Sequence, residues 1–196
     1  MSIFIAMFFF SLSMSISPGP VNMTILSSGV NYGFNRSFSL VSGATIGFTI
    51  LLTAVGLGIS NLVEEVPVFY EWLRYAGTGY MIYIGYKIIV SRPEIEVKEE
   101  KRPRFLHGFL MQWLNPKAWI ACLSGVSAFG LNSSPSLLLV FICIYFIICY
   151  LSLAAWAQLG SKLQFLTKVK NGIQIFNAGM GGLLMIVAVY LLLSAL

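Results

Sequence analysis

The sequence contains no aspartate, and its seven acidic residues are all glutamates. Charged residues make up 10% of the 196 residues, against about 25% in a typical soluble domain. Hydrophobic residues reach 58%, and the mean hydropathy is +0.85. A soluble domain of this length could not bury so much apolar surface, so we expect the lipid bilayer to be the main solvent of the chain.

Cysteine and histidine are also scarce. The three cysteines, Cys122, Cys143 and Cys149, lie inside apolar runs, and His107 is the only histidine. Without a CxxC pair or a Cys/His cluster, neither a metal site nor a disulfide is predicted. Walker, GxSxG and HExxH motifs are missing as well, so we expect a protein that is not an enzyme, uses no cofactor and does not hydrolyse ATP. The net charge of +5 comes from basic residues in predicted loops and does not indicate nucleic-acid binding.

Six apolar runs are each long enough to cross a hydrocarbon layer of about 30 Å. We therefore predict an all-α integral membrane protein, with a single transmembrane domain over residues 1–196. The first run lacks the basic residues that precede the apolar part of a signal peptide, so it is predicted to be the first span. The predicted spans are 3–28, 38–60, 67–90, 105–130, 135–160 and 173–195.

Basic residues gather on one set of connections between these spans. Ten of the twelve lysines and arginines lie in or beside the first, third and fifth connections, and only Arg74 and Lys117 fall elsewhere. Basic residues favour the cytoplasmic side of a membrane. We therefore predict that these connections face the cytoplasm and that both termini lie on the periplasmic or extracellular side.

Two of the predicted spans are interrupted by proline in matching places. The residues at these breaks are Ser17, Pro18, Gly19 and Pro20 in the first span and Asn115, Pro116 and Lys117 in the fourth. A break frees backbone groups that lipid cannot satisfy, so it occurs where the helix borders a cavity or packs against protein. A matched pair, one in each half, is typical of the binding site of a transporter. A proline kink that only shapes helix packing remains the alternative.

The two halves of the chain also resemble each other. The breaks at Pro18 and Pro116 are 98 positions apart, and an A-G-x-G pattern at Ala76 recurs 102 positions later at Ala178. With three spans in each half, the second copy enters the membrane from the opposite side. We therefore predict two inverted-topology repeats, at about 1–91 and about 105–196, joined by a cytoplasmic loop at about 92–104.

The break residues indicate the chemistry of a binding site. Pro20 starts a helix whose free N–H groups carry partial positive charge, which suits a carboxylate, and carbonyls freed around 15–17 suit an ammonium. Lys117 is the most deeply placed charged residue; it could bind a carboxylate, bind a freed carbonyl or extend to the membrane surface. The predicted substrate-binding residues are Ser17, Pro18, Gly19, Pro20, Asn22, Gln112, Asn115, Pro116 and Lys117.

A second group of residues is predicted to pack helices together or to line a further cavity. Small residues let helix backbones approach closely, and polar residues form hydrogen bonds between membrane helices. The residues in this group are Gly43, Gly47, Gly77, Gly79, Gln158 and Asn177.

Longer motifs run in order over essentially the whole chain. They are S-P-G-P-V-N-M at 17–23, G-x-N-x-G-F-N-R-S at 29–37, G-A-T-I-G-F at 43–48, A-G-T-G-Y-M-I-Y-I-G-Y-K at 76–87 and F-L-H-G-F-L-M-Q-W-L-N-P-K-A at 105–118. In this combination the chain resembles the LysE/RhtB family of amino-acid exporters. The resemblance implies a bacterial inner-membrane protein that exports amino acids, by exchange against an ion gradient such as protons.

The branch of the family that the chain resembles handles homoserine, threonine, cysteine and related small neutral amino acids. The absence of aspartate is consistent with this, because a dibasic substrate would need a carboxylate partner. The implied partners are an amino-acid substrate and the lipid bilayer, with a homo-oligomer left open. Two other classes remain as alternatives: a passive channel for a small polar solute, and a membrane scaffold that transports nothing.

Overall fold

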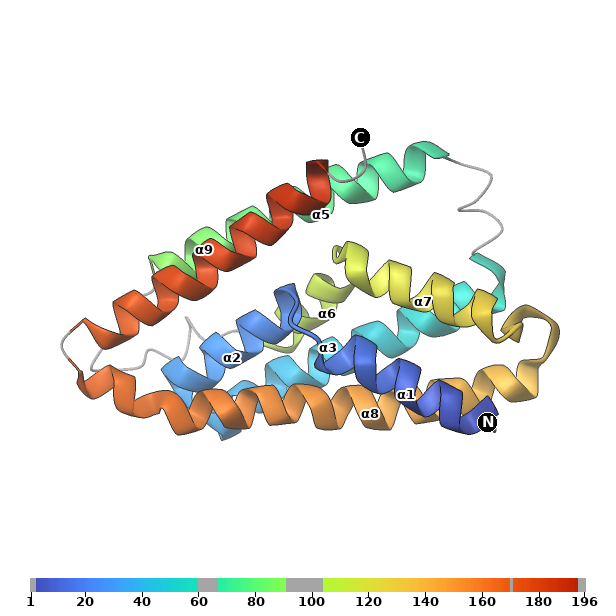
Figure 1. Cartoon of the computed structure of the whole chain (residues 1–196), viewed down its shortest axis with the longest axis horizontal. Coiled ribbons are helices and arrows are strands. Elements are labelled where there is room, and N and C mark those ends of the chain that lie inside the picture. Colours follow the sequence, from blue (N-terminus) through green and yellow to red (C-terminus); the bar gives the residue numbers. More distant parts are fainter. Residues whose placement is uncertain (1–2, 60–66, 91–103, 170, 194–196) are drawn as a thin grey trace.

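The computed structural model of the chain describes residues 3–59, 67–90, 104–169 and 171–193 (Figure 1). The described part is entirely helical. Its α-helices are α1 (Ile3–Ile16), α2 (Pro20–Tyr32), α3 (Phe34–Ala54), α5 (Pro67–Ile89), α6 (Phe105–Trp113), α7 (Pro116–Ala128), α8 (Pro135–Lys162) and α9 (Gly172–Leu193). Short π- or 3₁₀-helical turns lie at Val55–Ile59, Leu131–Ser133 and Leu163–Lys168.

Both predicted breaks are confirmed. Helix α1 ends before Pro18, and α2 starts at Pro20 with a bend of 58° between the two helix axes. Helix α6 ends before Asn115, and α7 starts at Pro116. Proline suits the first position of a helix because the N–H that it lacks would have no partner there. The Asn115 side chain caps α7 by accepting a hydrogen bond from the Lys117 N–H at 3.1 Å.

Several of the described helices have the length and hydropathy of membrane spans. Phe34–Gly58 and Pro135–Leu166 each satisfy both criteria alone, and the bent pair of α1 and α2 makes a third span if it is counted as one. The chain is therefore a membrane protein with multiple apolar helices, whereas the six spans remain a prediction. Most of the predicted loop at 92–104 lies outside the described residues.

Helices from the two halves of the chain pack against each other reciprocally. Helix α8 runs along α1 and α2, α3 runs along α6, and α5 pairs with α9. Figure 1 shows α5 and α9 side by side along the upper edge of the molecule. Every one of these pairings joins a helix of the first half to a helix of the second.

Glycines bring several of these pairs into close contact. Gly43 and Gly47 of α3 lie against the backbone of Phe105 and Phe109 of α6, and a Cβ at Gly47 would be 2.9 Å from the Phe109 Cα. In the same way Gly29 of α2 lies against α8, and Gly85 of α5 lies against α9. Such contacts are typical of membrane helices, whose association depends on close packing rather than on the hydrophobic effect.

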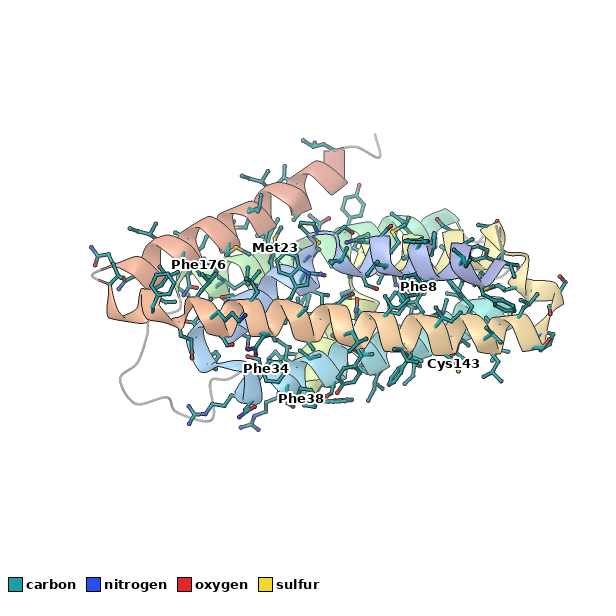
Figure 2. The ribbon with its side chains drawn as sticks, turned by 60° about the horizontal axis from the view of Figure 1, so that its bottom comes forward. Phe8, Met23, Phe34, Phe38, Cys143 and Phe176 are labelled. Carbon is teal, nitrogen blue, oxygen red and sulfur yellow. The ribbon has the colours of Figure 1, made fainter. Side chains whose placement is uncertain are left out.

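Aromatic rings fill the centre of the bundle and apolar side chains cover its outside. The rings of Phe48 on α3 and Tyr145 on α8 have centroids 4.4 Å apart, and Phe10 of α1 packs on Tyr145 from another side. On the outer surface, Phe8 and Phe38 are exposed (Figure 2). An apolar exterior of this kind suits contact with lipid tails.

Connections gather at the two ends of the molecule. The connection from α2 to α3 and the connection from α8 to α9 lie at the left end of Figure 1. The start of α1 and the connection from α7 to α8 lie at the right end. At the left end the chain turns at Gly33, which has φ of +81°, a backbone angle that glycine adopts readily.

Candidate functional site

A lysine joins the two breaks directly. The Lys117 ammonium on α7 donates hydrogen bonds to the Ser17 backbone carbonyl at 2.8 Å and to the Ser17 hydroxyl at 2.7 Å. Gly19 provides the space for this contact, because a Cβ there would lie 3.2 Å from both Cδ and Nζ of Lys117. Of the roles that the sequence left open for Lys117, this structure shows the contact with a freed carbonyl. We call this Lys117–Ser17 contact the clasp.

Side chains also occupy the other carbonyls freed at the first break. The Asn22 amide donates to the Ser15 carbonyl at 2.8 Å, and the Trp156 indole of α8 donates to the Ile16 carbonyl at 3.2 Å. In this arrangement of the helices these carbonyls therefore already accept hydrogen bonds from the protein, and their proposed contact with a ligand stays a prediction. The physical reason is that an unpaired carbonyl costs several kcal/mol where lipid replaces water, so the protein supplies its own donors.

A small polar cavity lies between the breaks. It has a volume of about 30 Å³, and its lining includes Ser15, Asn22, Gln112, Asn115, Lys117 and Tyr145. The Gln112 amide is almost fully buried and has no hydrogen-bond partner among the described residues. The Ser15 hydroxyl faces Tyr145 and Cys149 without hydrogen-bond geometry to either. This volume holds one or two waters and is too small for an amino acid.

The charge of the small cavity is unbalanced. Lys117 is the only charged residue among the described residues that line it. Its partners in the clasp are a carbonyl and a hydroxyl, which are dipoles rather than anions. A charge inside a membrane protein is costly and marks a functional site by default. A ligand carboxylate would balance this charge.

The predicted binding residues divide into three groups in the structure. Asn22, Gln112, Asn115 and Lys117 line the small cavity, whereas Ser17 and Gly19 hold the clasp next to it. Pro20 and Pro116 contribute as the first residues of α2 and α7. Pro18 is exposed and does not line the cavity.

The residues that were predicted to pack helices together or to line a further cavity have different surroundings in the structure. Asn177 of α9 is fully buried and accepts hydrogen bonds from Ser27 and Asn31 of α2, both at 3.3 Å. Gln158 is exposed, and its side chain accepts from Ser161 of the same helix, so it is not an interhelical bond. A Cβ at Gly79 would meet nothing within 4 Å, so close packing does not explain that glycine. The surroundings of Gly77 lie outside the described side chains.

A larger cavity, which the sequence analysis missed, lies between α2, α5 and α6. Its volume is about 210 Å³, seven times that of the small cavity. Polar residues of α2 line it together with basic residues of α5 and α6. The sequence signals were the polar run on α2 and the single histidine. The polar lining residues are Thr24, Ser27, Ser28, Asn31, Tyr32, Tyr83, Lys87 and His107.

Two broken helices that meet at a half-buried charge, within an apolar helical bundle, are typical of membrane transporters. The chain belongs to the LysE type translocator family, whose sequence model matches residues 12–195. The resemblance recognised from the motifs is thereby confirmed, and this is a family of translocators rather than of enzymes.

Curated relatives carry a more specific description. The cysteine/O-acetylserine efflux proteins of Escherichia coli strain K12, Shigella flexneri serotype 5b and Shigella sonnei are each 29% identical to this chain over 129 residues. The aligned part covers 65% of this chain and 66% of each relative, just under two thirds of the relatives' length. No solved structure is significantly similar to the chain.

Proposed function

We propose that this protein exports small neutral amino acids of the cysteine, O-acetylserine, homoserine and threonine class from the cytoplasm, driven by an ion gradient. The observation that carries the proposal is the unbalanced Lys117 charge between the two breaks. It suits the carboxylate of an amino acid. No acidic residue lines either cavity within the described part of the chain, which disfavours a substrate with an extra positive charge.

The two cavities support a transport cycle rather than an open pore. The small cavity, beside which Ser17 holds Lys117, has a volume of only about 30 Å³, whereas the larger cavity has about 210 Å³, enough for a small ligand. The two cavities are neighbours along α6, because Met111 lines the larger cavity and the next residue, Gln112, lines the small one. In the proposed cycle the substrate enters at the larger cavity, displaces Lys117 from Ser17 and binds between the breaks before release on the other side.

The reciprocal pairing of helices supports the proposed inverted repeat. The second helix of each half, α3 or α8, packs on the broken helix of the other half, and the third helices, α5 and α9, pack on each other. Two inverted copies related by an axis in the membrane plane would produce this pattern of contacts. The site between the breaks then lies on the axis that relates the copies.

Efflux from preloaded cells tests the proposed function. Cells that express the protein are expected to lose labelled cysteine or O-acetylserine severalfold faster than control cells, and an uncoupler should remove the difference. Labelled lysine and arginine serve as matched controls and should be retained. Rapid loss that ignores the uncoupler would instead identify a passive channel. Unchanged efflux of every amino acid, with the protein present in the membrane, would reject the exporter and favour the scaffold.

We also propose that the protein lies in the bacterial inner membrane with both termini outside the cytoplasm. In a background with Cys143→Ser, the exposed positions Asn35 and Ser133 can be replaced separately by cysteine. A membrane-impermeant maleimide is expected to label Ser133→Cys on intact spheroplasts and Asn35→Cys only after lysis. The reverse pattern would invert the proposed orientation without affecting the fold.

A further inference from the structure

The larger cavity differs from the break site in its position and in its chemistry. It lies toward the ends of α2 and α5 and the start of α6, the end of the molecule that the basic connections predict to be cytoplasmic. Its walls come from three helices, and the α5 wall belongs to the α5–α9 pair at the upper edge of Figure 1. An exporter must collect its substrate on the cytoplasmic side, so the lining of this cavity shows what it can collect.

The wall formed by α2 presents oxygen acceptors. The hydroxyl donors on this wall are already used within the protein: Thr24 donates to the Pro20 carbonyl at 2.9 Å, and Ser27 donates to Asn177 at 3.3 Å. A hydroxyl has one donor and two acceptor lone pairs, so the Thr24 oxygen keeps acceptor capacity, and the Ser27 oxygen, which also accepts from the Asn31 amide at 3.4 Å, keeps one lone pair. They suit a ligand that donates hydrogen bonds.

Ser28 and Asn31 extend the same wall. Ser37 donates to the Gly33 carbonyl at 2.9 Å, so in its 2.8 Å contact with Ser28 the hydroxyl of Ser28 is the donor. The Asn31 amide nitrogen donates to the Ser27 carbonyl at 2.8 Å, which leaves its carbonyl oxygen as an acceptor. A ligand ammonium, which has only donors, matches this wall.

The residues that α5 and α6 contribute to the lining present donors and positive charge. The Lys87 ammonium lies 5.6 Å from the centre of the Tyr83 ring and forms no ion pair with any described residue. His107 accepts a hydrogen bond from the Arg104 N–H at its Nδ1, at 3.4 Å, so its Nε2 carries the proton and can donate. A carboxylate accepts hydrogen bonds from both kinds of group. Ile84, Ile88 and Met111 complete the lining with apolar surface.

We propose that this cavity is a loading site for an α-amino-acid zwitterion. The carboxylate binds Lys87 and His107, the ammonium binds the α2 oxygens at Thr24 and Asn31, and a small side chain rests on the apolar residues. The inference rests on the proposed export function but names a site other than the breaks. It assigns the first recognition of the substrate to a cavity that contains none of the break residues.

Binding to the purified protein in lipid nanodiscs tests the loading site, with radiolabelled L-cysteine as the probe under reducing conditions. The competitors are cysteamine, which lacks the carboxylate, and 3-mercaptopropionate, which lacks the ammonium. Lys87→Gln and His107→Gln are each expected to weaken L-cysteine binding about five- to tenfold and to leave cysteamine unchanged. Thr24→Val, which keeps the side-chain shape, should weaken L-cysteine and cysteamine but not 3-mercaptopropionate.

Lys162→Gln is the matched control, since Lys162 is an exposed lysine at the end of α8 that does not line the cavity. Efflux measured with the same variants separates the two proposals. Wild-type efflux of cysteine together with unchanged binding in Lys87→Gln and His107→Gln would overturn the loading site and leave the export function intact. Absence of both binding and efflux of any amino acid in the wild type would overturn the two proposals together.

Discussion

Replacement of Lys117 by methionine is expected to slow efflux strongly while the protein still inserts and folds. The substitution keeps the length of the side chain and its packing over Gly19, but it removes the ammonium that holds Ser17. Hydrogen bonds to charged groups contribute about 1.5–3 kcal/mol, so transport through a site that uses this charge should fall about ten- to a hundredfold. Efflux of labelled cysteine per unit of membrane-inserted protein measures the effect.

Lys162→Met provides the control, because it removes an equivalent charge at an exposed position at the end of α8. It should export at the wild-type rate. Size-exclusion profiles of the two variants in detergent report whether each is folded. A folded Lys117→Met protein with unimpaired efflux would show that the clasp only ties the breaks together and would remove Lys117 from the transport mechanism.

The substitution Gly43→Leu is expected to prevent folding. A side chain at this position enters the backbone of Phe105 on α6, and neither helix can yield without separating the pair. Overpacking of a core commonly costs 1–3 kcal/mol, and a clash with backbone exceeds that range, so we expect a loss of more than about 3 kcal/mol. The yield of monodisperse protein and its melting temperature in detergent report the loss.

Gly79→Leu is the matched control for this change. Gly79 is also a glycine within a predicted span, but a Cβ there meets nothing within 4 Å. Leucine is also the better helix former, so this variant should be at least as stable as the wild type. Equal yields and melting temperatures for the two leucine variants would mean that α3 and α6 do not pack through Gly43.

The helical breaks were predictable from sequence because proline acts locally. A residue that lacks an N–H has the same effect on a helix in any surroundings, so Pro20 and Pro116 marked the starts of α2 and α7. Capping by Asn115 is equally local, since donor and acceptor are two residues apart. These short-range effects located the candidate site without knowledge of the packing.

Contacts between distant parts of the chain were not predictable in this way. The sequence left three roles open for Lys117, and the choice depended on Ser17, which is 100 residues away. Likewise, the donors that occupy the freed carbonyls include Trp156, which nothing in the local sequence connects to Ile16. Which groups meet is decided by the arrangement of the helices in space.

The remaining differences between prediction and structure arise because the sequence does not fix how each helix is oriented about its own axis. Gly79 and Gln158 lie within predicted spans, but the sequence does not say which side of a low-polarity helix faces the bundle, and both are exposed. The larger cavity was missed for a related reason. Lys87 and His107 lie near helix ends, where basic residues are expected for topology alone, and their common cavity with Asn31 exists only in the folded molecule.

The pairing of helices across the two halves has a consequence for biogenesis. During synthesis, α1, α2 and α3 leave the ribosome before α6 and α8, against which they pack. The glycine surface at Gly43 and the α2 surface at Gly29 therefore stay without their protein partners until the second half has been made. Most of the packing between the described helices joins the two halves, so we expect the bundle to assemble late, after insertion of the individual helices, with the last-made helix, α9, completing the pair with α5.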